Sequence, residues 1–288
     1  PTLLGAFRHN KYVKETGFEG ISSFQFTKDA FYDGNWNTII NHARGLFINI
    51  RTAKIVARSY DKFFLLGQYD YCTLDKFNPP FTVYKKYDGF LGIIGYDKES
   101  DQILYCSKST LYPYGDYAKI FYNEIHPLIK DEQALKNFLK TNNCSMIFEC
   151  IAPNIDPHIV HYSCNFIVLL DIVENTIEYK KPFDYDIYEQ ITNDLFYSIE
   201  VKEFVEKYQI IFDMIDMLKS KEGIEGYVIE DANGKMFKLK TYEYEANKIL
   251  RNIKDIYTKI KEQAGEHDIK CPSAEKIRER YCKFYDDI

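Results

Sequence analysis

Lys86-Tyr87-Asp88-Gly89, a K-x-D-G pattern, lies between two apolar runs and sets the context for three segments further along the chain. A pattern this short recurs by chance at ordinary composition, so it proves little alone. Downstream, Phe148-Glu149 closes an apolar run, Glu225-Gly226-Tyr227-Val228 opens another, and Phe237-Lys238-Leu239-Lys240 follows almost at once. Each of these patterns alone is weak evidence for a functional site. Together they are strong evidence, because they occur in one order: a lysine, an acidic residue, E-G-x-V and K-x-K.

Apolar patterning predicts strands on both sides of this stretch, over residues 46–50, 55–58, 81–86, 90–96 and 103–107. Further strands are predicted over residues 146–151, 159–172, 226–230 and 236–240. Asp231-Ala232-Asn233-Gly234 predicts a hairpin turn between the last two strands.

Helices are predicted over residues 116–140, interrupted at Pro127, and over residues 201–218, where apolar side chains mark one face. The chain after Tyr242 is predicted to be helical, and residues 1–45 mix short helical and loop patterns. Because helices stand between runs of strands without a regular βαβ alternation, we expect an α+β fold with antiparallel sheets.

Composition limits the possible partners. The 288 residues suffice for one large or two small domains. A net charge of −6 argues against non-specific coating of nucleic acid, although a local basic cleft remains compatible with it. Aromatic residues make up 16% of the chain, which fits either the codon usage of an AT-rich genome or base stacking along a nucleic-acid groove.

The seven cysteines are odd in number and contain no C-x-x-C pair, which predicts buried free thiols in a reducing compartment. The sequence has neither a recognisable signal peptide nor an apolar stretch of membrane-spanning length, so we expect a soluble cytoplasmic protein without a membrane partner. His158 and His161 would form a metal pair on a helix, but the surrounding residues are strand-like, which disfavours a zinc site.

Lys86 is the candidate nucleophile of the K-x-D-G pattern. A lysine attacks phosphorus only as the free amine, so its pKa must fall, and neighbouring cations would lower it while also holding a triphosphate. Gly89 is expected to keep the backbone open where a nucleotide lies, because it has no Cβ. Lys85 is the competing nucleophile, but only Lys86 fits the pattern.

Glu149 and Glu225 stand at the ends of apolar strands, where a carboxylate is costly unless it has a function. They are candidates for binding ribose hydroxyls or for holding Mg²⁺ through its water shell. Lys238 and Lys240 alternate at the strand period and point to one face, which suits an α-phosphate and the transition state at phosphorus. The alternatives are paired structural carboxylates and a solvated strand face.

The order of these motifs is that of covalent nucleotidyltransferases, and the chain most resembles the phage-type RNA ligase 1 family, ATP-dependent enzymes that reseal broken tRNA. The resemblance spans about residues 43–244. The segments that carry it are Ala43-Arg44-Gly45-Leu46-Phe47, Ala57-Arg58-Ser59-Tyr60-Asp61-Lys62-Phe63-Phe64, Ser107-Lys108-Ser109, Phe148-Glu149-Cys150-Ile151-Ala152-Pro153, Gly223-Ile224-Glu225-Gly226-Tyr227-Val228 and Phe237-Lys238-Leu239-Lys240. The chain departs from the family at Leu65, at Ser109 and around Asp156-Pro157-His158, where the family has Asn, Gly and a basic residue.

The resemblance implies a role for each matching residue. Lys86 would accept AMP, and Lys238 and Lys240 would grip the α-phosphate as its catalytic partners. The remaining residues implied to bind the nucleotide or RNA end are Arg44 and Lys62 for pyrophosphate, Lys108 for phosphates or the RNA end, Glu149 and Glu225 for ribose and metal, and Phe64, Gly89, Gly226 and Tyr244 as supporting positions. The implied cofactors are ATP and Mg²⁺, with Mn²⁺ as a possible substitute.

The implied fold is a nucleotidyltransferase (adenylyltransferase) domain over residues 1–244, with two antiparallel sheets flanking an ATP cleft. A short helical C-terminal segment would occupy residues 245–288. The implied function is an ATP-dependent RNA ligase that seals 5′-phosphate and 3′-hydroxyl ends through a covalent lysyl-AMP, in tRNA repair.

Three alternatives stay open: a GTP-dependent capping guanylyltransferase, a DNA ligase, and a non-catalytic nucleotide- or RNA-binding domain on the same fold. The first two normally carry an oligonucleotide-binding barrel after K-x-K, whereas this tail is predicted to be helical. The sequence has no G-x-x-x-x-G-K-[ST] loop, and His161-Tyr162-Ser163 lacks a second H-x-[ST]. We therefore expect an end-healing kinase and phosphatase to act in trans or on missing domains.

Overall fold

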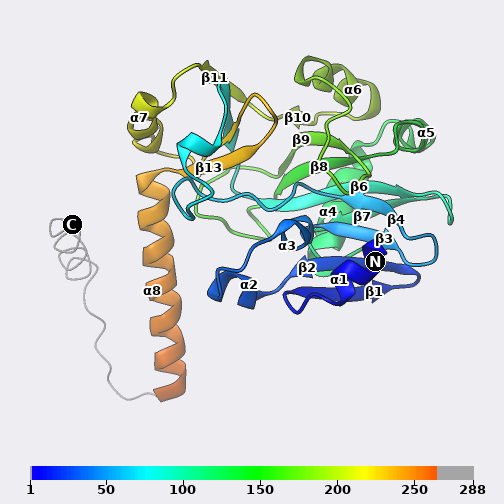
Figure 1. Ribbon diagram of the computed structural model, residues 1–288, viewed down its shortest axis with the longest axis horizontal. Coiled ribbons are helices and arrows are strands. Elements are labelled where there is room, and N and C mark those ends of the chain that lie inside the picture. The colour runs from blue at the N-terminus through cyan, green and yellow to red at the C-terminus, as the bar shows by residue number, and fades with distance from the viewer. Residues whose placement is uncertain (1, 265–288) are drawn as a thin grey trace.

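The computed structural model describes residues 2–264, whose strands form three β-sheets with helices packed around them (Figure 1). The N-terminal sheet has the order β1-β2-β3-β4, with β1 at Val13–Phe18, β2 at Ile21–Phe26, β3 at Leu46–Asn49 and β4 at Lys54–Arg58. The central sheet has the order β10-β9-β8-β6-β7, with β10 at Glu200–Val201, β9 at Phe166–Glu174, β8 at Cys144–Ile151, β6 at Phe90–Asp97 and β7 at Gln102–Ser107. The third sheet has the order β11-β5-β12-β13, with β11 at Phe204–Tyr208, β5 at Phe81–Lys86, β12 at Gly226–Glu230 and β13 at Met236–Lys240.

The helices of the described chain are α1 (Leu3–Arg8), α2 (Lys28–Tyr32), α3 (Thr38–His42), α4 (Asp116–Ile125), α5 (Glu132–Asn142), α6 (Tyr188–Leu195), α7 (Ile215–Lys219) and α8 (Tyr242–Ala264). Only β10 pairs with its neighbour in parallel among the named strand pairs of residues 2–264. The predicted α+β class with antiparallel sheets is confirmed. The two sheets expected beside the cleft are the central and third sheets, and the N-terminal sheet is additional.

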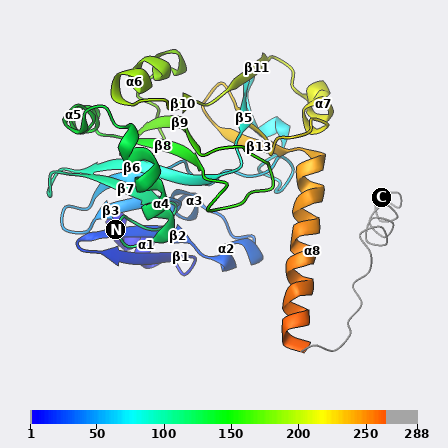
Figure 2. The same cartoon turned by 180° about the vertical axis from the view of Figure 1, so that it is seen from behind.

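The central sheet is covered on both faces. Helices α4 and α5 lie over one face, as the view from behind shows (Figure 2), where Phe121 and Leu135 pack against Phe148 of β8. Side chains alternate along a strand, so the neighbouring Ile147 points to the other face and packs with Ala57 of β4. Burial on both faces makes β6 and β8 a rigid base for the residues at their ends.

The K-x-D-G stretch is the connection between two sheets. Lys86 is the last residue of β5 in the third sheet, and after Tyr87-Asp88-Gly89 the chain enters β6 of the central sheet. In the third sheet Gly226 is paired with Lys86 on one side and with Lys240 on the other. In the central sheet Glu149 is paired with Leu91. Strand register therefore brings the separated sequence motifs to one place.

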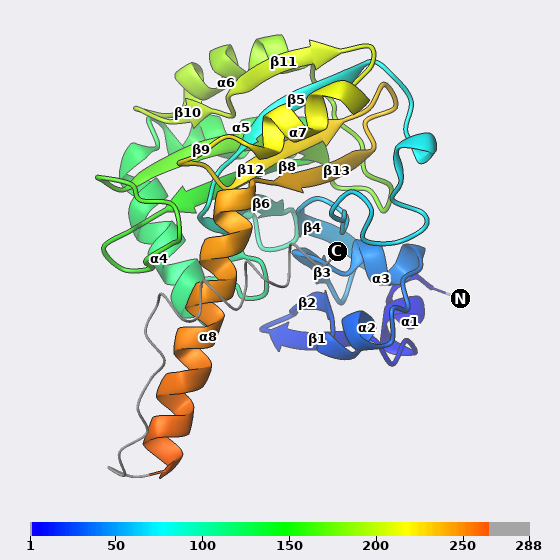
Figure 3. The same ribbon diagram turned by 90° about the vertical axis from the view of Figure 1, so that its left-hand side faces the viewer.

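Helix α8 begins directly after β13 and extends away from the sheets (Figure 3). The helix predicted after Tyr242 is present as far as Ala264, and the rest of the predicted C-terminal segment lies outside the described residues. The expected boundary between residues 244 and 245 falls within the first turn of this continuous helix.

The helix predicted over residues 201–218 is wrong. The structure has β10 and β11 there, then a 3₁₀ turn at Phe212–Met214 and the short helix α7. β11 pairs with the edge of β5, leaving Phe204 and Val205 exposed rather than on a buried helix face. Apolar spacing alone does not distinguish these outcomes because edge pairing depends on distant residues.

Two further differences concern strands. The strand predicted to start at residue 159 begins at Phe166 instead, because the backbone N–H groups of Ile159 and Val160 bond the Asp88 carboxylate rather than a neighbouring strand. β1 and β2 were not predicted at all. They form a hairpin around Glu19 and Gly20, both with positive φ, as a type I′ turn requires.

Four of the seven cysteines are buried free thiols, namely Cys72, Cys106, Cys144 and Cys150. Cys164 is also free but exposed, against the prediction of buried thiols, because it lies in the loop before β9. The other two cysteines lie outside the described residues. Among helices of residues 2–264, none combines the length and apolar character needed to cross a bilayer.

Candidate active site

A cavity of about 410 Å³ lies where the central and third sheets meet, and it gathers most of the predicted site residues. Eight of them line it: Arg44, Lys62, Lys86, Lys108, Glu149, Glu225, Lys238 and Lys240. They come from the segment before β3, the loop after β4, the end of β5, the residue after β7, strand β8, the residue before β12, and β13. Segments spread over most of the chain thus converge on one volume.

Glu225 joins two of the lysines. Its Oε2 lies 2.6 Å from Lys86 Nζ and its Oε1 lies 2.9 Å from Lys240 Nζ. Burial by itself would lower the pKa of Lys86, but the carboxylates of Glu225 and Glu149 outweigh it and hold that pKa above its ordinary value. Burial would raise the pKa of Glu225, but Lys86 and Lys240 hold it below its usual range.

The expectation that neighbouring cations lower the pKa of Lys86 is therefore wrong for this structure. Glu225, paired as an anion, stabilises the ammonium form of Lys86. The sequence does not reveal this effect because Glu225 and Lys86 meet only through the pairing of β5 with β12. Lys86 becomes a nucleophile only after this ion pair is broken.

The lysines whose pKa values are strongly lowered are Lys62 and Lys238. Burial, with the charges of Arg44 and Lys108, lowers the pKa of Lys62 to about 7. Burial, with the charges of Lys62, Lys86, Arg44 and Lys240, lowers the pKa of Lys238 to about 6. Burial also lowers the pKa values of Lys108 and Arg44.

Within residues 2–264, no carboxylate forms an ion pair with Arg44, Lys62, Lys108 or Lys238. Their polar contacts include uncharged groups: Lys62 Nζ donates to the Phe63 carbonyl at 2.8 Å, and Arg44 donates to the Ser59 hydroxyl at 3.0 Å. Unpaired buried cations are costly, so such a cluster is suited to an anionic ligand that supplies the missing negative charge.

Glu149 faces the turn after Lys86. Its Oε1 accepts a hydrogen bond from the Gly89 N–H at 3.0 Å, and burial raises its pKa to about 7. A Cβ on Gly89 would lie 2.5 Å from the Cys150 carbonyl oxygen. Glycine is thus required by the close approach of β8, which corrects the expectation that it leaves room for a nucleotide.

The four predicted supporting residues do not line the cavity but contact those that do. The Phe64 ring lies 4.0 Å from Lys62 Nζ, and the Tyr244 ring lies 4.5 Å from Lys240 Nζ. Gly89 bonds Glu149 as described above. A Cβ on Gly226 would lie 2.1 Å from the Leu239 carbonyl oxygen, so glycine permits the tight pairing of β12 with β13.

Asp88 has a role that its place in the motif does not reveal. Its Oδ2 accepts from the N–H groups of Ile159 and Val160 at 2.9 and 3.1 Å, and its Oδ1 accepts from the Tyr244 hydroxyl at 3.0 Å. The Tyr162 hydroxyl accepts from the Asp88 N–H at 3.0 Å. Asp88 thus ties the loop before β9 and the first turn of α8 to the segment that carries Lys86.

Two lysines lining the cavity were missed. Lys248 of α8 stands one turn after Tyr244, so helical spacing offered a signal for it, and the charge of Lys240 lowers its pKa. Lys202 is buried beside Tyr84, but the erroneous helix prediction concealed its place between β10 and β11. Apolar side chains of the cavity wall, which include Leu170, Val228 and Met236, offer a surface for a flat ring.

The predicted metal ligands Glu149 and Glu225 both line the cavity. In the part of the chain that the structure describes, no group of three or more His, Cys, Asp or Glu residues is placed to hold a metal ion. Two carboxylates suit Mg²⁺ when phosphate oxygens and water complete its shell. The donor set therefore fits a metal ion that arrives with a nucleotide rather than a closed metal centre.

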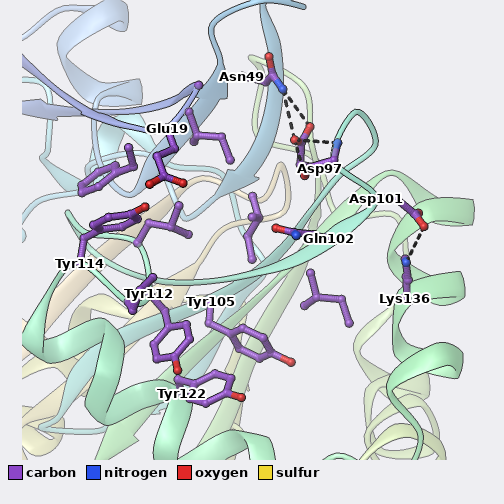
Figure 4. Close-up of a pocket in the computed structure, with 18 of the residues that line it drawn as sticks. Glu19, Asn49, Asp97, Asp101, Gln102, Tyr105, Tyr112, Tyr114, Tyr122 and Lys136 are labelled. Atoms are coloured by element: carbon purple, nitrogen blue, oxygen red, sulfur yellow. Dashed lines mark hydrogen bonds and ion pairs between the residues drawn. The ribbon is translucent and has the colours of Figure 1, made fainter.

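A larger cavity of about 670 Å³ lies at the other end of β6 and contains none of the predicted site residues (Figure 4). Its charged groups are paired with their neighbours: Asn49 donates to Asp97 at 3.1 Å, and Lys136 donates to Asp101 at 2.7 Å. Its size does not make it the reaction site, because it lacks a nucleophile beside unpaired cations.

Comparison with known families agrees with this placement. The family model described as RNA ligase matches residues 42–245, and the chain belongs to this phage-type RNA ligase family. No curated protein matches the chain.

Solved structures show the same fold. An archaeal ATP-dependent RNA ligase is 15% identical with a TM-score of 0.55, the match covering 85% of this chain and 62% of that one. A Naegleria gruberi RNA ligase mutant with ATP and Mn is 16% identical with a TM-score of 0.51, covering 65% of this chain and 56% of that one. The chain thus spans little more than half the length of these relatives, and the likeness establishes the nucleotidyltransferase fold.

Proposed function

We propose that this chain is an ATP-dependent RNA ligase that joins 5′-phosphate and 3′-hydroxyl RNA ends through a covalent AMP on Lys86. The observation that carries the proposal is the position of Lys86 in a cavity with four cations, Arg44, Lys62, Lys108 and Lys238, that have no carboxylate partner in residues 2–264. A triphosphate supplies the negative charge that these residues lack, beside a lysine able to attack it.

In the first step Lys86 attacks the α-phosphorus of ATP and pyrophosphate leaves. Each group of residues has a separate task in this step. Arg44, Lys62 and Lys108 bind the β- and γ-phosphates and neutralise the departing pyrophosphate. Lys238 and Lys240 bind the α-phosphate, where charge grows in the transition state. The apolar wall of the cavity takes the adenine ring, and Glu149 and Glu225 bind the ribose hydroxyls.

Activation of Lys86 depends on Glu225. While Glu225 balances Lys86, the amine stays protonated. When Glu225 turns to the ribose or to a metal ion, the remaining cationic neighbours lower the pKa of Lys86 and its proton leaves. Mg²⁺ bound by Glu149, Glu225 and phosphate oxygens would neutralise phosphate charge, and Mn²⁺ would serve in the same way.

The two later steps use the same cations. The nitrogen–phosphorus bond to Lys86 breaks as an RNA 5′-phosphate oxygen attacks the AMP, which gives a 5′-adenylated end. A 3′-hydroxyl oxygen then attacks the RNA phosphate and AMP leaves, which closes the phosphodiester. Broken tRNA is the substrate that the family resemblance favours. An end-healing kinase and phosphatase would act in trans or on further domains. The buried free thiols favour the reducing cytoplasm as the compartment.

Incubation with α-labelled ATP or GTP and Mg²⁺, followed by denaturing electrophoresis, tests the proposal. We expect a covalent label from ATP that is lost in Lys86→Ala and kept in Lys85→Ala, the adjacent lysine, which pairs with Glu203 at 3.0 Å. A label from GTP would instead support a capping guanylyltransferase. Absence of label from both nucleotides would leave a non-catalytic binding domain. Sealing of DNA ends in preference to RNA ends would favour a DNA ligase.

A further inference from the structure

A cluster of aromatic side chains from residues 26–71 borders the candidate active site. We call it the aromatic rim, and it consists of Phe26, Phe31, Trp36, Phe64, Tyr69 and Tyr71. The rings contact one another in series: Phe31 and Trp36 have centroids 4.8 Å apart, Trp36 and Phe64 5.0 Å, and Phe64 and Tyr71 5.5 Å. The Trp36 indole N–H donates to the Tyr69 hydroxyl at 3.0 Å, which fixes the centre of the rim.

Parts of the rim face solvent. Phe31 is 41% exposed and Tyr71 is 42% exposed, whereas Phe64 between them is buried. Phe31 stands on α2, and Phe26, Phe31 and Trp36 all precede the region matched by the RNA ligase family model. The exposed face of Phe31 therefore belongs to a part of this chain that the family match leaves unexplained, whereas Tyr71 lies within the matched region.

Cations lie next to these rings. Lys62 Nζ is 4.0 Å from the Phe64 centroid and 5.4 Å from the Phe31 centroid, and Lys108 Nζ is 5.0 Å from the Phe26 centroid. Neither lysine has a carboxylate partner in residues 2–264. Exposed aromatic faces beside unpaired cations are the combination that binds single-stranded nucleic acid, since bases stack on the rings and phosphates meet the charges.

The rim is continuous with the active site. Phe26, Phe31, Lys62 and Lys108 line the main cavity, and Lys62 also lines a smaller cavity of about 300 Å³ that includes Phe64 and Tyr71. A strand whose reactive end reaches Lys86 would leave the cavity across these side chains. A protein partner fits less well, because an apolar surface would leave Lys62 and Lys108 unpaired on binding.

We propose that the aromatic rim binds the single-stranded RNA adjoining the reactive end, with bases stacked on Phe31 and Tyr71 and phosphates beside Lys62 and Lys108. This inference rests on the proposed ligase function and adds to it the surface that holds the RNA. It assigns a role to the N-terminal aromatic residues in substrate binding rather than in the reaction with ATP.

Trp36 offers a direct readout because it is the only tryptophan in the sequence. A base stacked on Phe31 alters the surroundings of the indole ring directly, because the Phe31 and Trp36 rings are in contact, and a base on Tyr71 alters them through Phe64 and Tyr69. Titration of the full chain with a 5′-phosphorylated octa-adenylate RNA should therefore change Trp36 emission in step with binding measured by anisotropy of a dye-labelled copy of that RNA.

Substitutions sharpen the experiment. Phe31→Ala and Tyr71→Ala should each weaken RNA binding about 5- to 150-fold, the loss expected for one stacked base. Phe31→Trp should restore it, because an aromatic face is retained. Phe212→Ala is the matched control: Phe212 is 72% exposed and lies in the 3₁₀ turn beside α7, which packs on the third sheet, whereas α2 lies beside the N-terminal sheet (Figure 3). Circular dichroism and thermal midpoints confirm that each variant is folded.

The outcomes separate this inference from the proposed function. RNA binding with unchanged Trp36 emission and normal affinity in both alanine variants would overturn the assignment of the rim to RNA, and would leave that surface to a protein partner. Covalent labelling by ATP is measured separately on the same preparations. A chain that becomes labelled at Lys86 yet shows no effect at the rim loses only the present inference.

Discussion

Two buried carboxylates in this protein each contact two lysines, yet their surroundings differ. Asp171 of β9 is 3.2 Å from Lys181 and 3.6 Å from Lys202, and it accepts hydrogen bonds from the Tyr179 and Tyr188 hydroxyls at 2.7 and 2.5 Å. Lys181 is also paired with Glu230, so two lysines meet two carboxylates and the charges balance.

Glu225 holds Lys86 and Lys240 at similar distances, but further cations surround it. Arg44, Lys62 and Lys238 lie in the same cavity, and none of the three has a carboxylate partner in the described chain. Ion-pair geometry alone therefore does not distinguish a structural cluster from a functional one. The surplus of positive charge does, because a fold has no reason to maintain it without a ligand.

The largest effect is expected at the balanced cluster. Asp171→Asn leaves Lys181 and Lys202 without their shared carboxylate in a buried site, which should lower the free energy of unfolding by about 3–5 kcal/mol. Urea denaturation measures this change. Asp101→Asn, which removes an exposed partner of Lys136, is the control and should have a small effect. Equal losses in both variants would contradict the structural role of Asp171.

The unbalanced cluster should respond in the opposite way. Lys238→Met removes a buried cation without a partner, so the free energy of unfolding should stay the same or rise. The rate of covalent labelling by ATP should fall about 100- to 1000-fold, because the group facing the growing phosphate charge is lost. Urea denaturation tests the predicted stability, and covalent labelling on the same preparation tests the predicted loss of rate. Marked destabilisation with normal labelling would reverse the assignment of the two clusters.

The pH dependence of stability gives a smaller effect of defined sign. In the folded protein the pKa values of Lys62 and Lys238 are lowered to about 7 and about 6, so above those values the unfolded chain binds more protons. The penalty from these two groups is full below pH 6 and declines as pH rises towards their ordinary pKa near 10.5. Unfolding free energies at pH 6.5, 7.5 and 8.5 should rise more steeply in the wild type than in a Lys62→Met, Lys238→Met double variant. Parallel curves would show that these pKa values are not lowered.

ATP binding should also take up protons. At pH 8 Lys62 and Lys238 are largely neutral, and a bound triphosphate raises the pKa values of both, so up to about two protons per ATP should be absorbed. Calorimetry in two buffers of different ionisation enthalpy, on Lys86→Ala to prevent turnover, measures this number. Lys62→Met in the same background should reduce it. Proton release on binding would contradict the assignment of these cations to the triphosphate.

The sequence was informative where function restricts residue type and spacing. The motif residues converge on one cavity because they lie in or next to strands whose pairing brings them together. Local patterns could not reveal the pKa of Lys86, which depends on Glu225 far along the chain, or the true reason for Gly89, which is the carbonyl of Cys150. Lys202 was hidden by the helix wrongly predicted around it.

Local sequence patterns were also insufficient to predict the structure of the N-terminal region. Glu19 and Gly20 form a hairpin turn that the sequence analysis did not recognise, so the strands beside it and the packing of α2 were not anticipated. Composition shows that aromatic residues are abundant but does not show where they gather. In the structure several of them gather at the mouth of the cavity, where Phe31 and Tyr71 are partly exposed.

The central claim is that the unbalanced cluster is a nucleotide site built around Lys86. The most direct test is peptide mapping by tandem mass spectrometry after incubation with ATP and Mg²⁺, with GTP as the parallel sample. The account predicts AMP attached to Lys86 in the ATP sample and an unmodified chain in the GTP sample. AMP on Lys85 or another lysine, or an unmodified chain in both samples, would contradict it.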